Sequence, residues 1–280
     1  MPELPLNFQA LARSYAEVIG DPIAHSKSPL IHGFWLRALG IDADYRATRV
    51  APADLPAYFA ARRADPAWRG CNVTVPHKLA ALTQVEDRGD IRATIGAINL
   101  AMRADDGALI GANTDAGGFY APIAGFDFTD KPVVVIGAGG AARAVLFALA
   151  KMAVGPVTVL NRTPLKGAAL LSNFGLKGRA LPLSAPVPPA ALLVNASTLG
   201  MTGQPPLDLD LSPLPDDAVV YDLVYAPLET DLLAQANDRG LETVDGLEML
   251  VAQAALAFEL LFGVEPPRER DDELRDLLIG

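Results

Sequence analysis

The sequence predicts an α/β protein of two domains, an α/β substrate-binding domain and a Rossmann-type doubly wound domain that binds a dinucleotide. Short apolar segments alternate with helical segments through most of the chain, which implies parallel strands with helices on both faces of a sheet. A glycine-rich segment, 137–142, follows one apolar strand and opens a helix. The length of 280 residues is sufficient for two domains.

The first part of the chain, about 16–115, predicts alternating strands and helices. Strands are indicated by short apolar or alternating segments, and a helix is predicted to end at Gly40. Pro76 is well suited to the first position of a helix, and Asp105-Asp106-Gly107 is a hairpin turn signal. In order, these elements are strand 16–20, helix 28–40, strand 44–50, helix 53–64, strand 71–75, a helix from Pro76, and the hairpin 97–113.

The second part begins at the apolar segment 131–137 and again alternates. The predicted elements are strand 131–137, helix 141–152, and strands 157–160, 192–197 and 218–225; the Pro-rich segment 182–190 predicts a surface loop. The final helix, 246–263, is apolar nearly all round, which is typical of a buried helix. We expect it to pack back on the first domain. The predicted domains are therefore 1–115 plus 246–280, and 116–245.

Composition excludes several classes of protein. The net charge of −10 argues against a protein that coats nucleic acid. A single cysteine, Cys71, permits no intrachain disulfide, and the three histidines show no metal-ligand spacing. We expect no signal peptide, because residues 1–20 lack a basic start followed by an apolar core. We expect no membrane span, because the most apolar region, 132–160, is broken by Arg143 and Lys151. These features predict a cytoplasmic protein without a metal, and they leave a homodimer open.

The glycine-rich segment has the spacing of a phosphate-binding turn. Gly137 permits the tight turn, Gly139 lets the backbone approach a pyrophosphate, and Ala142 is small enough for close packing of helix and strand. The N-terminus of the helix that follows offers free N–H groups to phosphates. The alternative is a simple glycine-rich connector, but a strand before it and a helix after it favour the dinucleotide.

The next strand ends in Asn161-Arg162-Thr163, where an NAD-binding unit usually carries an acidic residue for the ribose hydroxyl. Arg162 can meet a 2′-phosphate with forked donors, and Thr163 adds a hydroxyl. This combination predicts NADP rather than NAD. The alternative is that Arg162 is an ordinary solvated loop residue.

Reduction of a ketone by a nicotinamide also requires a proton, and Lys78 and Asp115 are candidates for its transfer. Lys78 falls in the first turn of the helix predicted from Pro76, where a cation is disfavoured, whereas a nearby carboxylate would favour the charged form. Asp115 could accept a substrate hydroxyl or pair with Lys78. The alternatives are a surface lysine, a helix N-cap at Asp115, and a strand-edge amide at Asn99.

Nine segments in order resemble the shikimate dehydrogenase family, over roughly residues 16–263. They are VIGDPIAHSKSP (18–29), NVTVPHK (72–78), IGAIN (95–99), GANTDAGG (111–118), VIGAGGAARAV (135–145), NRT (161–163), NASTLGM (195–201), YDLVYAPLET (221–230) and DGLEMLVAQA (245–254). The resemblance implies NADP-dependent, reversible reduction of 3-dehydroshikimate to shikimate, in the pathway to chorismate and aromatic amino acids. Leu100, Ala116 and Ala226 depart from residues that are common in the family.

The resemblance implies that eight side chains surround the substrate. They are Ser26, Ser28, Thr74, Lys78, Asn99, Asp115, Tyr225 and Gln253. The two serines would bind the carboxylate, and the amides, Thr74 and Asp115 would hold ring hydroxyls. Lys78 would be the acid/base group and, with Asp115, would form the catalytic pair.

The resemblance also implies thirteen cofactor-binding positions. They are Gly137, Ala138, Gly139, Gly140, Ala141, Asn161, Arg162, Thr163, Thr198, Met201, Leu223, Gly246 and Met249. Asn161, Arg162 and Thr163 would grip the 2′-phosphate, whereas Gly246 and Met249 would lie near the nicotinamide.

Three substrate candidates, the serine pair and Gln253, have a physical argument of their own. Ser26 and Ser28 can present two hydroxyls to one carboxylate beside the N–H groups of a starting helix, although Ser28 can equally serve as the helix cap. Gln253 is an amide in an apolar helix, and a buried amide must be hydrogen-bonded, by protein or by a polyhydroxylated ligand. The alternative is that Gln253 lies on a thin exposed stripe.

Two other functions are considered beside the main one. A quinate dehydrogenase, or an enzyme with both substrates or with NAD, would need room beside the serine pair for an additional hydroxyl; Arg162 weighs against NAD. A non-catalytic NADP-binding regulator could keep the fold, but intact Lys78 and Asp115 argue against it.

Overall fold

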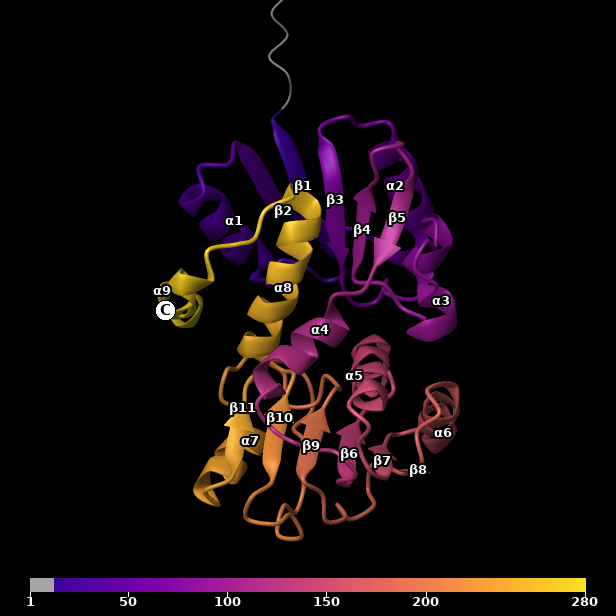
Figure 1. Ribbon diagram of the computed structural model, residues 1–280, viewed down its shortest axis with the longest axis vertical. Coiled ribbons are helices and arrows are strands. Elements are labelled where there is room, and N and C mark those ends of the chain that lie inside the picture. Colours follow the sequence, from indigo (N-terminus) through magenta and orange to yellow (C-terminus); the bar gives the residue numbers. More distant parts are fainter. Residues whose placement is uncertain (1–12) are drawn as a thin grey trace, which may run out of the picture.

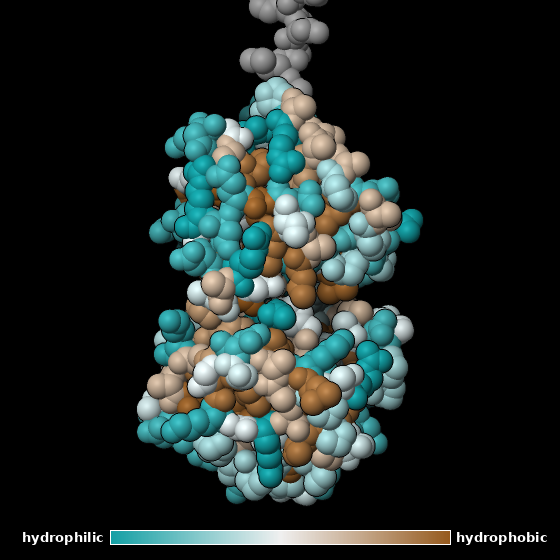
Figure 2. Space-filling view, turned by 90° about the vertical axis from the view of Figure 1, so that its right-hand side faces the viewer, coloured by the Kyte–Doolittle hydropathy of each residue, from teal (hydrophilic) through white to brown (hydrophobic). Residues whose placement is uncertain are grey.

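The structure is a computed structural model that describes residues 13–280. Two lobes, each built on its own β-sheet, are stacked along the long axis (Figure 1). Helices α4 (Asp115–Tyr120) and α8 (Gly246–Phe262) lie where the two lobes meet. The surface narrows between the lobes, as Figure 2 shows from the side. No helix within residues 13–280 is both long and apolar enough to cross a bilayer.

The first lobe contains a five-stranded mixed sheet in the order β2-β1-β3-β4-β5. Strands β1, β2 and β3 are parallel, and β4 and β5 form an antiparallel hairpin, as the sequence predicted. The strands are β1 (Ser14–Gly20), β2 (Ala43–Arg49), β3 (Trp68–Val73), β4 (Leu100–Arg103) and β5 (Leu109–Ala112). The helices are α1 (Ser28–Ala38), η1 (Pro52–Asp54), α2 (Leu55–Arg63), η2 (Ala80–Gln84) and α3 (Ile91–Thr94).

Alternation along β1 gives the first sheet two apolar faces. Ala16 and Val18 pack in one core with residues of α1 and α8, whereas Tyr15 and Ile19 pack in another with residues of α2. Side chains of successive strand residues point to opposite faces, so one short apolar strand serves both cores. Helices therefore cover both faces of the sheet, as the strand–helix alternation predicted.

The helix predicted to begin at Pro76 is not formed. Residues 74–79 make turns, and only the short 3₁₀ helix η2 follows. Two backbone groups of this segment form hydrogen bonds with the end of β1 and the residue after it. Thr74 N–H donates to the Ile19 carbonyl, and the Val75 carbonyl accepts from Asp21 N–H. Lys78 consequently lies in a turn, and the argument from a helix N-terminus does not apply to it.

The second lobe contains a six-stranded, fully parallel sheet in the order β11-β10-β9-β6-β7-β8. Numbered within the sheet, this is the doubly wound order 6-5-4-1-2-3, which confirms the predicted Rossmann-type fold. The strands are β6 (Val133–Ile136), β7 (Val157–Leu160), β8 (Gly178–Leu181), β9 (Leu192–Asn195), β10 (Val219–Asp222) and β11 (Glu242–Val244). The edge strands β8 and β11 were not predicted, because they are short and largely exposed or half-buried.

Helices again cover both faces of the second sheet. Val133 and Val135 pack with α5 (Gly140–Lys151) and α6 (Pro164–Asn173), whereas Val134 and Ile136 pack with α7 (Asp231–Asp238). The Pro-rich segment 182–190 contains no helix or strand, as expected for a loop. The remaining helices are η3 (Ala121–Ile123), η4 (Arg268–Arg270) and α9 (Asp271–Ile279).

Helix α8 returns the chain to the first lobe and packs in its core, as the apolar pattern predicted. It crosses α4 at very short range, because a Cβ atom at Gly118 would collide with Gln253 and one at Gly117 would lie 2.7 Å from Leu256 Cδ1. The boundaries predicted from the sequence fall at the first residue of α4 and at Asp245, the N-cap of α8. The part of the first predicted domain before residue 13 lies outside the described residues.

A histidine lies fully buried in the core between α1 and α8. The His32 ring stacks on Tyr45 with 4.0 Å between ring centroids, and Trp35 and Phe258 surround it. Neither ring nitrogen has a hydrogen-bond partner among the described residues. Burial lowers the pKa of His32 from 6.5 to about 3, so the ring is neutral in the folded protein at neutral pH.

Because the unfolded chain binds a proton on His32 at a higher pH than the folded chain, His32 should reduce stability as the pH falls from 6.5 towards about 3. A His32→Phe variant keeps an aromatic ring on Tyr45 and cannot be protonated. Its free energy of unfolding relative to the wild type should increase by about 2 kcal/mol between pH 7 and pH 5. Urea unfolding at several pH values measures this difference, in which the other titrating groups cancel; a difference independent of pH would contradict the assignment.

Candidate functional site

The predicted substrate residues of the first lobe come from one edge of its sheet. Strands β1, β3 and β5 run in the same direction, so the segments that follow them emerge together at the edge nearest the second lobe. These segments carry Ser26 and Ser28, Thr74 and Asp115, and Asn99 precedes β4 at the same edge. Gly20 brings two of the segments into contact, because a Cβ atom there would lie 2.7 Å from Thr74 Cγ2.

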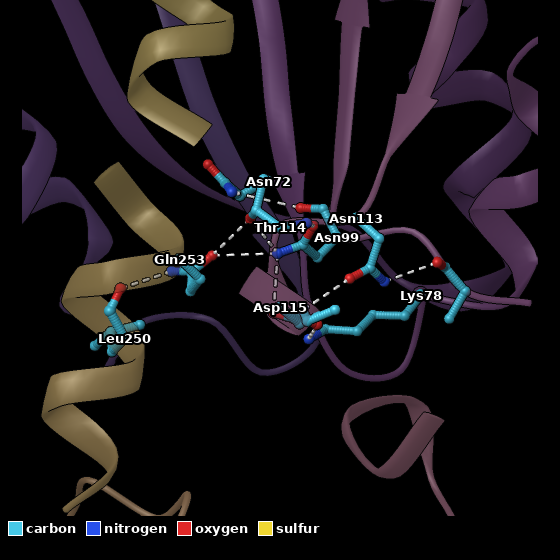
Figure 3. Close-up of polar contacts among 10 residues, drawn as sticks. Asn72, Lys78, Asn99, Asn113, Thr114, Asp115, Leu250 and Gln253 are labelled. Atoms are coloured by element: carbon cyan, nitrogen blue, oxygen red, sulfur yellow. Dashed lines mark hydrogen bonds and ion pairs between the residues drawn. The ribbon is translucent and has the colours of Figure 1, made fainter. Parts of the chain in front are cut away.

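Lys78 and Asp115 form the ion pair at the centre of this edge (Figure 3). Lys78 Nζ donates to Asp115 Oδ2 at 2.5 Å, and the two side chains are only 14% and 6% exposed. The alternative of a free surface lysine is therefore wrong. Asp115 is the first residue of α4 and Thr114 is the N-cap, so the capping role considered for Asp115 is also wrong.

The Asn99 amide joins three segments of the chain (Figure 3). Its Nδ2 lies 2.8 Å from Thr114 Oγ1, 2.9 Å from Asp115 Oδ1 and 3.2 Å from Gln253 Oε1, and its Oδ1 accepts from Thr114 N–H at 2.7 Å. Gln253 is 8% exposed and donates to the Leu250 carbonyl, so it does not lie on an exposed stripe. Thr114, which the sequence did not single out, belongs to this cluster.

Ser26 and Ser28 lie at the start of α1, but the capping role considered for Ser28 is wrong. Ser26 Oγ accepts the Ser28 N–H at 3.3 Å, and the N-cap position belongs to Lys27, so Ser28 is not the cap. The Ser28 side chain is buried, and within residues 13–280 its hydroxyl makes no hydrogen bond. Lys27 Nζ donates to the Leu278 carbonyl at 2.5 Å, which gives Lys27 a structural role.

The glycine-rich turn of the second lobe has the geometry that a pyrophosphate requires. Gly137 has φ +106°, and a Cβ atom there would lie 3.0 Å from the Ala196 carbonyl oxygen. A Cβ at Gly139 would have no neighbour within 4 Å, and as N-cap of α5 Gly139 leaves the first N–H groups without a side-chain cap. These residues therefore fit the phosphates of a dinucleotide.

The two lobes meet at this turn. A Cβ atom at Gly140 would lie 3.3 Å from Cδ of Lys78, and Arg143 Nη1 of the same helix donates to the Ile95 carbonyl at 3.4 Å. Lys78 thus stands against the phosphate-binding turn, although it belongs to the other lobe. A cofactor on the turn and a substrate beside Lys78 would therefore be neighbours.

The residues after β7 fit NADP rather than NAD. Arg162 and Thr163 are exposed, and Asn161 Nδ2 donates to the Thr163 carbonyl at 2.8 Å, which orders the turn before α6. No acidic residue occurs between Leu160 and α6, and Arg162 forms no ion pair with the described carboxylates. Because Gly137 N–H donates to the Leu160 carbonyl, this turn adjoins the glycine-rich turn.

The other predicted cofactor positions lie on loops after β9 and β10 and at the start of α8. Thr198 and Met201 follow β9, and Leu223 and Tyr225 follow β10. Gly246 is required by close approach, because a Cβ there would lie 2.5 Å from the carbonyl oxygens of Leu223 and Val224; Met249, one turn further along α8, is buried. Tyr225 packs against the core of the first lobe, and burial raises its pKa.

Three buried polar residues that the sequence analysis did not identify organise these loops. Asn195 and Asp222 are the last residues of β9 and β10, and Thr230 caps α7. All three are at most 2% exposed and are joined by hydrogen bonds. The available signal was a polar residue ending each of two otherwise apolar strands, LLVN and VVYD.

The fold and the site define a two-domain oxidoreductase that uses a nicotinamide dinucleotide. Three domain families match the chain: "Shikimate dehydrogenase substrate binding domain" at residues 18–101, "Shikimate / quinate 5-dehydrogenase" at 121–186 and "Shikimate 5'-dehydrogenase C-terminal domain" at 246–271. The chain belongs to the shikimate dehydrogenase family.

Three relatives span almost the whole chain. The shikimate dehydrogenase (NADP(+)) of Sphingopyxis alaskensis is 66% identical over 96% of this chain and 98% of that protein. The Thermus thermophilus shikimate 5-dehydrogenase, solved with NADP(H) and shikimate, is 39% identical with a TM-score of 0.82, over 95% and 99% of the two chains. The quinate dehydrogenase of Corynebacterium glutamicum, solved with NAD, is 29% identical with a TM-score of 0.82, over 95% and 99%.

Proposed function

We propose that the chain is an NADP-dependent shikimate dehydrogenase, which reversibly reduces 3-dehydroshikimate to shikimate with NADPH. The reaction belongs to the shikimate pathway to chorismate and aromatic amino acids. One observation carries the proposal: the Lys78–Asp115 pair of the first lobe lies against Gly140 of the phosphate-binding turn. The candidate proton donor of one lobe thereby lies beside the dinucleotide site of the other, as carbonyl reduction by a dinucleotide requires.

The substrate would be held by neutral groups on one side and by the ion pair on the other. The hydroxyls of Ser26 and Ser28 face its carboxylate, so an anion is bound without burial of a counter-charge. Thr74, Asn99 and Gln253, with Asp115, accept and donate to its ring hydroxyls, and Tyr225 closes the site from the second lobe. The cluster around the Asn99 amide is already hydrogen-bonded before the ligand arrives, which limits the ordering cost of binding.

When bound, NADPH supplies the hydride that reduces the carbonyl. Lys78 delivers a proton from Nζ to the carbonyl oxygen in reduction, and takes it back in oxidation. Asp115 accepts from Lys78 Nζ through Oδ2, and Asn99 Nδ2 donates to Oδ1 of the same carboxylate. Asn99 therefore orients the Asp115 carboxylate, and the carboxylate orients the lysine. This arrangement positions the proton donor before the reaction begins.

The cofactor would lie along the edge of the second sheet. Gly137, Ala138, Gly139, Gly140 and Ala141 face the pyrophosphate, with the N-terminus of α5 beneath it. Asn161, Arg162 and Thr163 hold the 2′-phosphate. Thr198, Met201, Leu223, Gly246 and Met249 line the nicotinamide end. A cytoplasmic location and a homodimer remain predictions from the sequence.

Quinate is the second candidate substrate, because a quinate dehydrogenase shares this fold at 29% identity. That enzyme was solved with NAD. In this chain the strand that would carry an acidic residue for the NAD ribose is followed by Asn161-Arg162-Thr163 instead. The chain therefore departs from the NAD pattern at the residue that distinguishes the two cofactors. A non-catalytic regulator is disfavoured by the intact Lys78–Asp115 pair.

Steady-state turnover of shikimate and quinate, each with NADP⁺ and NAD⁺, tests the proposal directly. We expect rapid turnover only with shikimate and NADP⁺. Comparable turnover of quinate would overturn the substrate, and a preference for NAD⁺ would overturn the cofactor. Absence of turnover with any pair, with NADPH binding preserved, would identify a regulator.

Replacement of Lys78 by alanine should lower kcat by about 10²–10⁴-fold, the usual contribution of a positioned acid or base, with a much smaller change in the dissociation constant of shikimate. Stopped-flow turnover and equilibrium binding measure the two quantities. Lys177→Ala, an exposed lysine of the second lobe, is the matched control. Equal losses in rate and affinity would contradict the acid/base role.

Replacement of Arg162 by serine should reduce the preference for NADP⁺ over NAD⁺, measured as the ratio of kcat/KM values, by about 10–100-fold, because a charge-assisted pair with the 2′-phosphate is lost. Activity with NAD⁺ should change little. Arg179→Ser, which removes an exposed arginine from the edge strand β8, is the control. An unchanged ratio would show that Arg162 is only a solvated residue.

A further inference from the structure

We propose that Asp222 is a positioning residue that fixes both nicotinamide loops, 196–201 after β9 and 223–230 after β10, relative to α8. The proposal rests on the proposed function, because those loops carry the residues that would line the nicotinamide. Asp222 touches neither ligand itself. It acts through Asn195, Thr230 and the backbone of the two loops.

Asn195 shapes the first loop. Its Oδ1 accepts from Ser197 Oγ at 2.7 Å and from Ser197 N–H at 3.1 Å, and its Nδ2 donates to the Leu199 carbonyl at 3.0 Å. The same Nδ2 donates to Asp222 Oδ1 at 2.8 Å. The conformation of loop 196–201 is thus set by one amide, and the orientation of that amide is set by Asp222.

Asp222 shapes the second loop from both of its ends. Oδ1 accepts from Val224 N–H at 3.0 Å, at the start of the loop, and Oδ2 accepts from Thr230 Oγ1 at 2.7 Å, at its end. Thr230 Oγ1 in turn accepts from Leu233 N–H at 3.3 Å, which caps α7. The Asp222 carboxylate is therefore hydrogen-bonded to both ends of loop 223–230.

The two loops then support the start of α8. Thr202 N–H donates to the Ala226 carbonyl at 2.7 Å, which ties the loops together. Gly246 packs on the carbonyl oxygens of Leu223 and Val224, the residues directly after Asp222. A change in the loop after β10 would therefore move both the loop residues proposed to line the nicotinamide and the first turn of α8, which carries Gly246 and Met249.

Asp222 is a buried carboxylate at a position where an apolar side chain would be enough for packing. The side chain is completely buried, and no cation pairs with it among residues 13–280. Burial raises its pKa, which shows the cost of placing a carboxylate there. Three donors converge on its two oxygens, and only a group that accepts on both sides satisfies all three.

Replacement of Asp222 by asparagine tests this requirement at constant shape, because one of the three donors must then face an NH₂ group. We expect the dissociation constant of NADPH, measured by fluorescence titration, and the KM for NADP⁺ to rise about tenfold, the effect of one unsatisfied buried group. The KM for shikimate should rise less than the KM for NADP⁺, since Tyr225 is the one proposed substrate residue on the two loops and the cluster around Asn99 keeps its own hydrogen bonds. Asp217→Asn, at an exposed carboxylate two residues before β10, is the matched control.

A pair of variants at Thr230 keeps the proposal testable if Asp222→Asn fails to fold. Thr230→Val removes the hydroxyl and should weaken NADPH binding, whereas Thr230→Ser keeps the hydroxyl and should restore it. Wild-type affinity in Asp222→Asn or in Thr230→Val would overturn the proposal, as would equal losses towards NADP⁺ and shikimate. If the wild type binds NADPH but turns over no substrate, the proposed function fails, while the NADPH titrations still decide the role of Asp222.

Discussion

The close approach of α4 and α8 at Gly118 is the constraint on which the site depends. Only a residue without a side chain lets the two backbones meet at this distance, because a Cβ atom would collide with Gln253. The contact places Asp115, the first residue of α4, within reach of Asn99, and Asn99 within reach of Gln253 on α8. The Lys78–Asp115 ion pair and the contact between the Asn99 and Gln253 amides therefore depend on one helix crossing.

Three buried carboxylates, Glu17, Asp115 and Asp222, have different hydrogen-bond donors. Glu17 accepts hydrogen bonds from Arg62 and Tyr58 on the α2 face of the first sheet. Asp115 is paired with Lys78, whose side chain is 14% exposed. Asp222 has only neutral donors. Of the three, only Asp115 forms its ion pair where the two lobes meet.

Local signals in the sequence were sufficient for the central strands and the phosphate-binding turn of the second lobe. The glycine spacing around Gly137 and the absence of an acid beside Arg162 are read from neighbours along the chain, and the strand order confirms the doubly wound fold. The surroundings of Lys78 could not be predicted in this way, because the segment after β3 gives its backbone groups to residues 19–21 rather than to a helix. The roles of Asn195 and Asp222 depend on two strands that are adjacent only in the folded sheet.

The return of α8 to the first lobe has a consequence for the order in which the chain folds during synthesis. The second sheet is contiguous in sequence, so it can close as soon as β11 has left the ribosome. The first sheet begins earlier, yet one of its faces is covered by Phe258 and its neighbours, about 240 residues after Ala16. The core on this face of the first lobe is therefore completed only after α8 has been synthesised, although α1 can cover part of the face earlier.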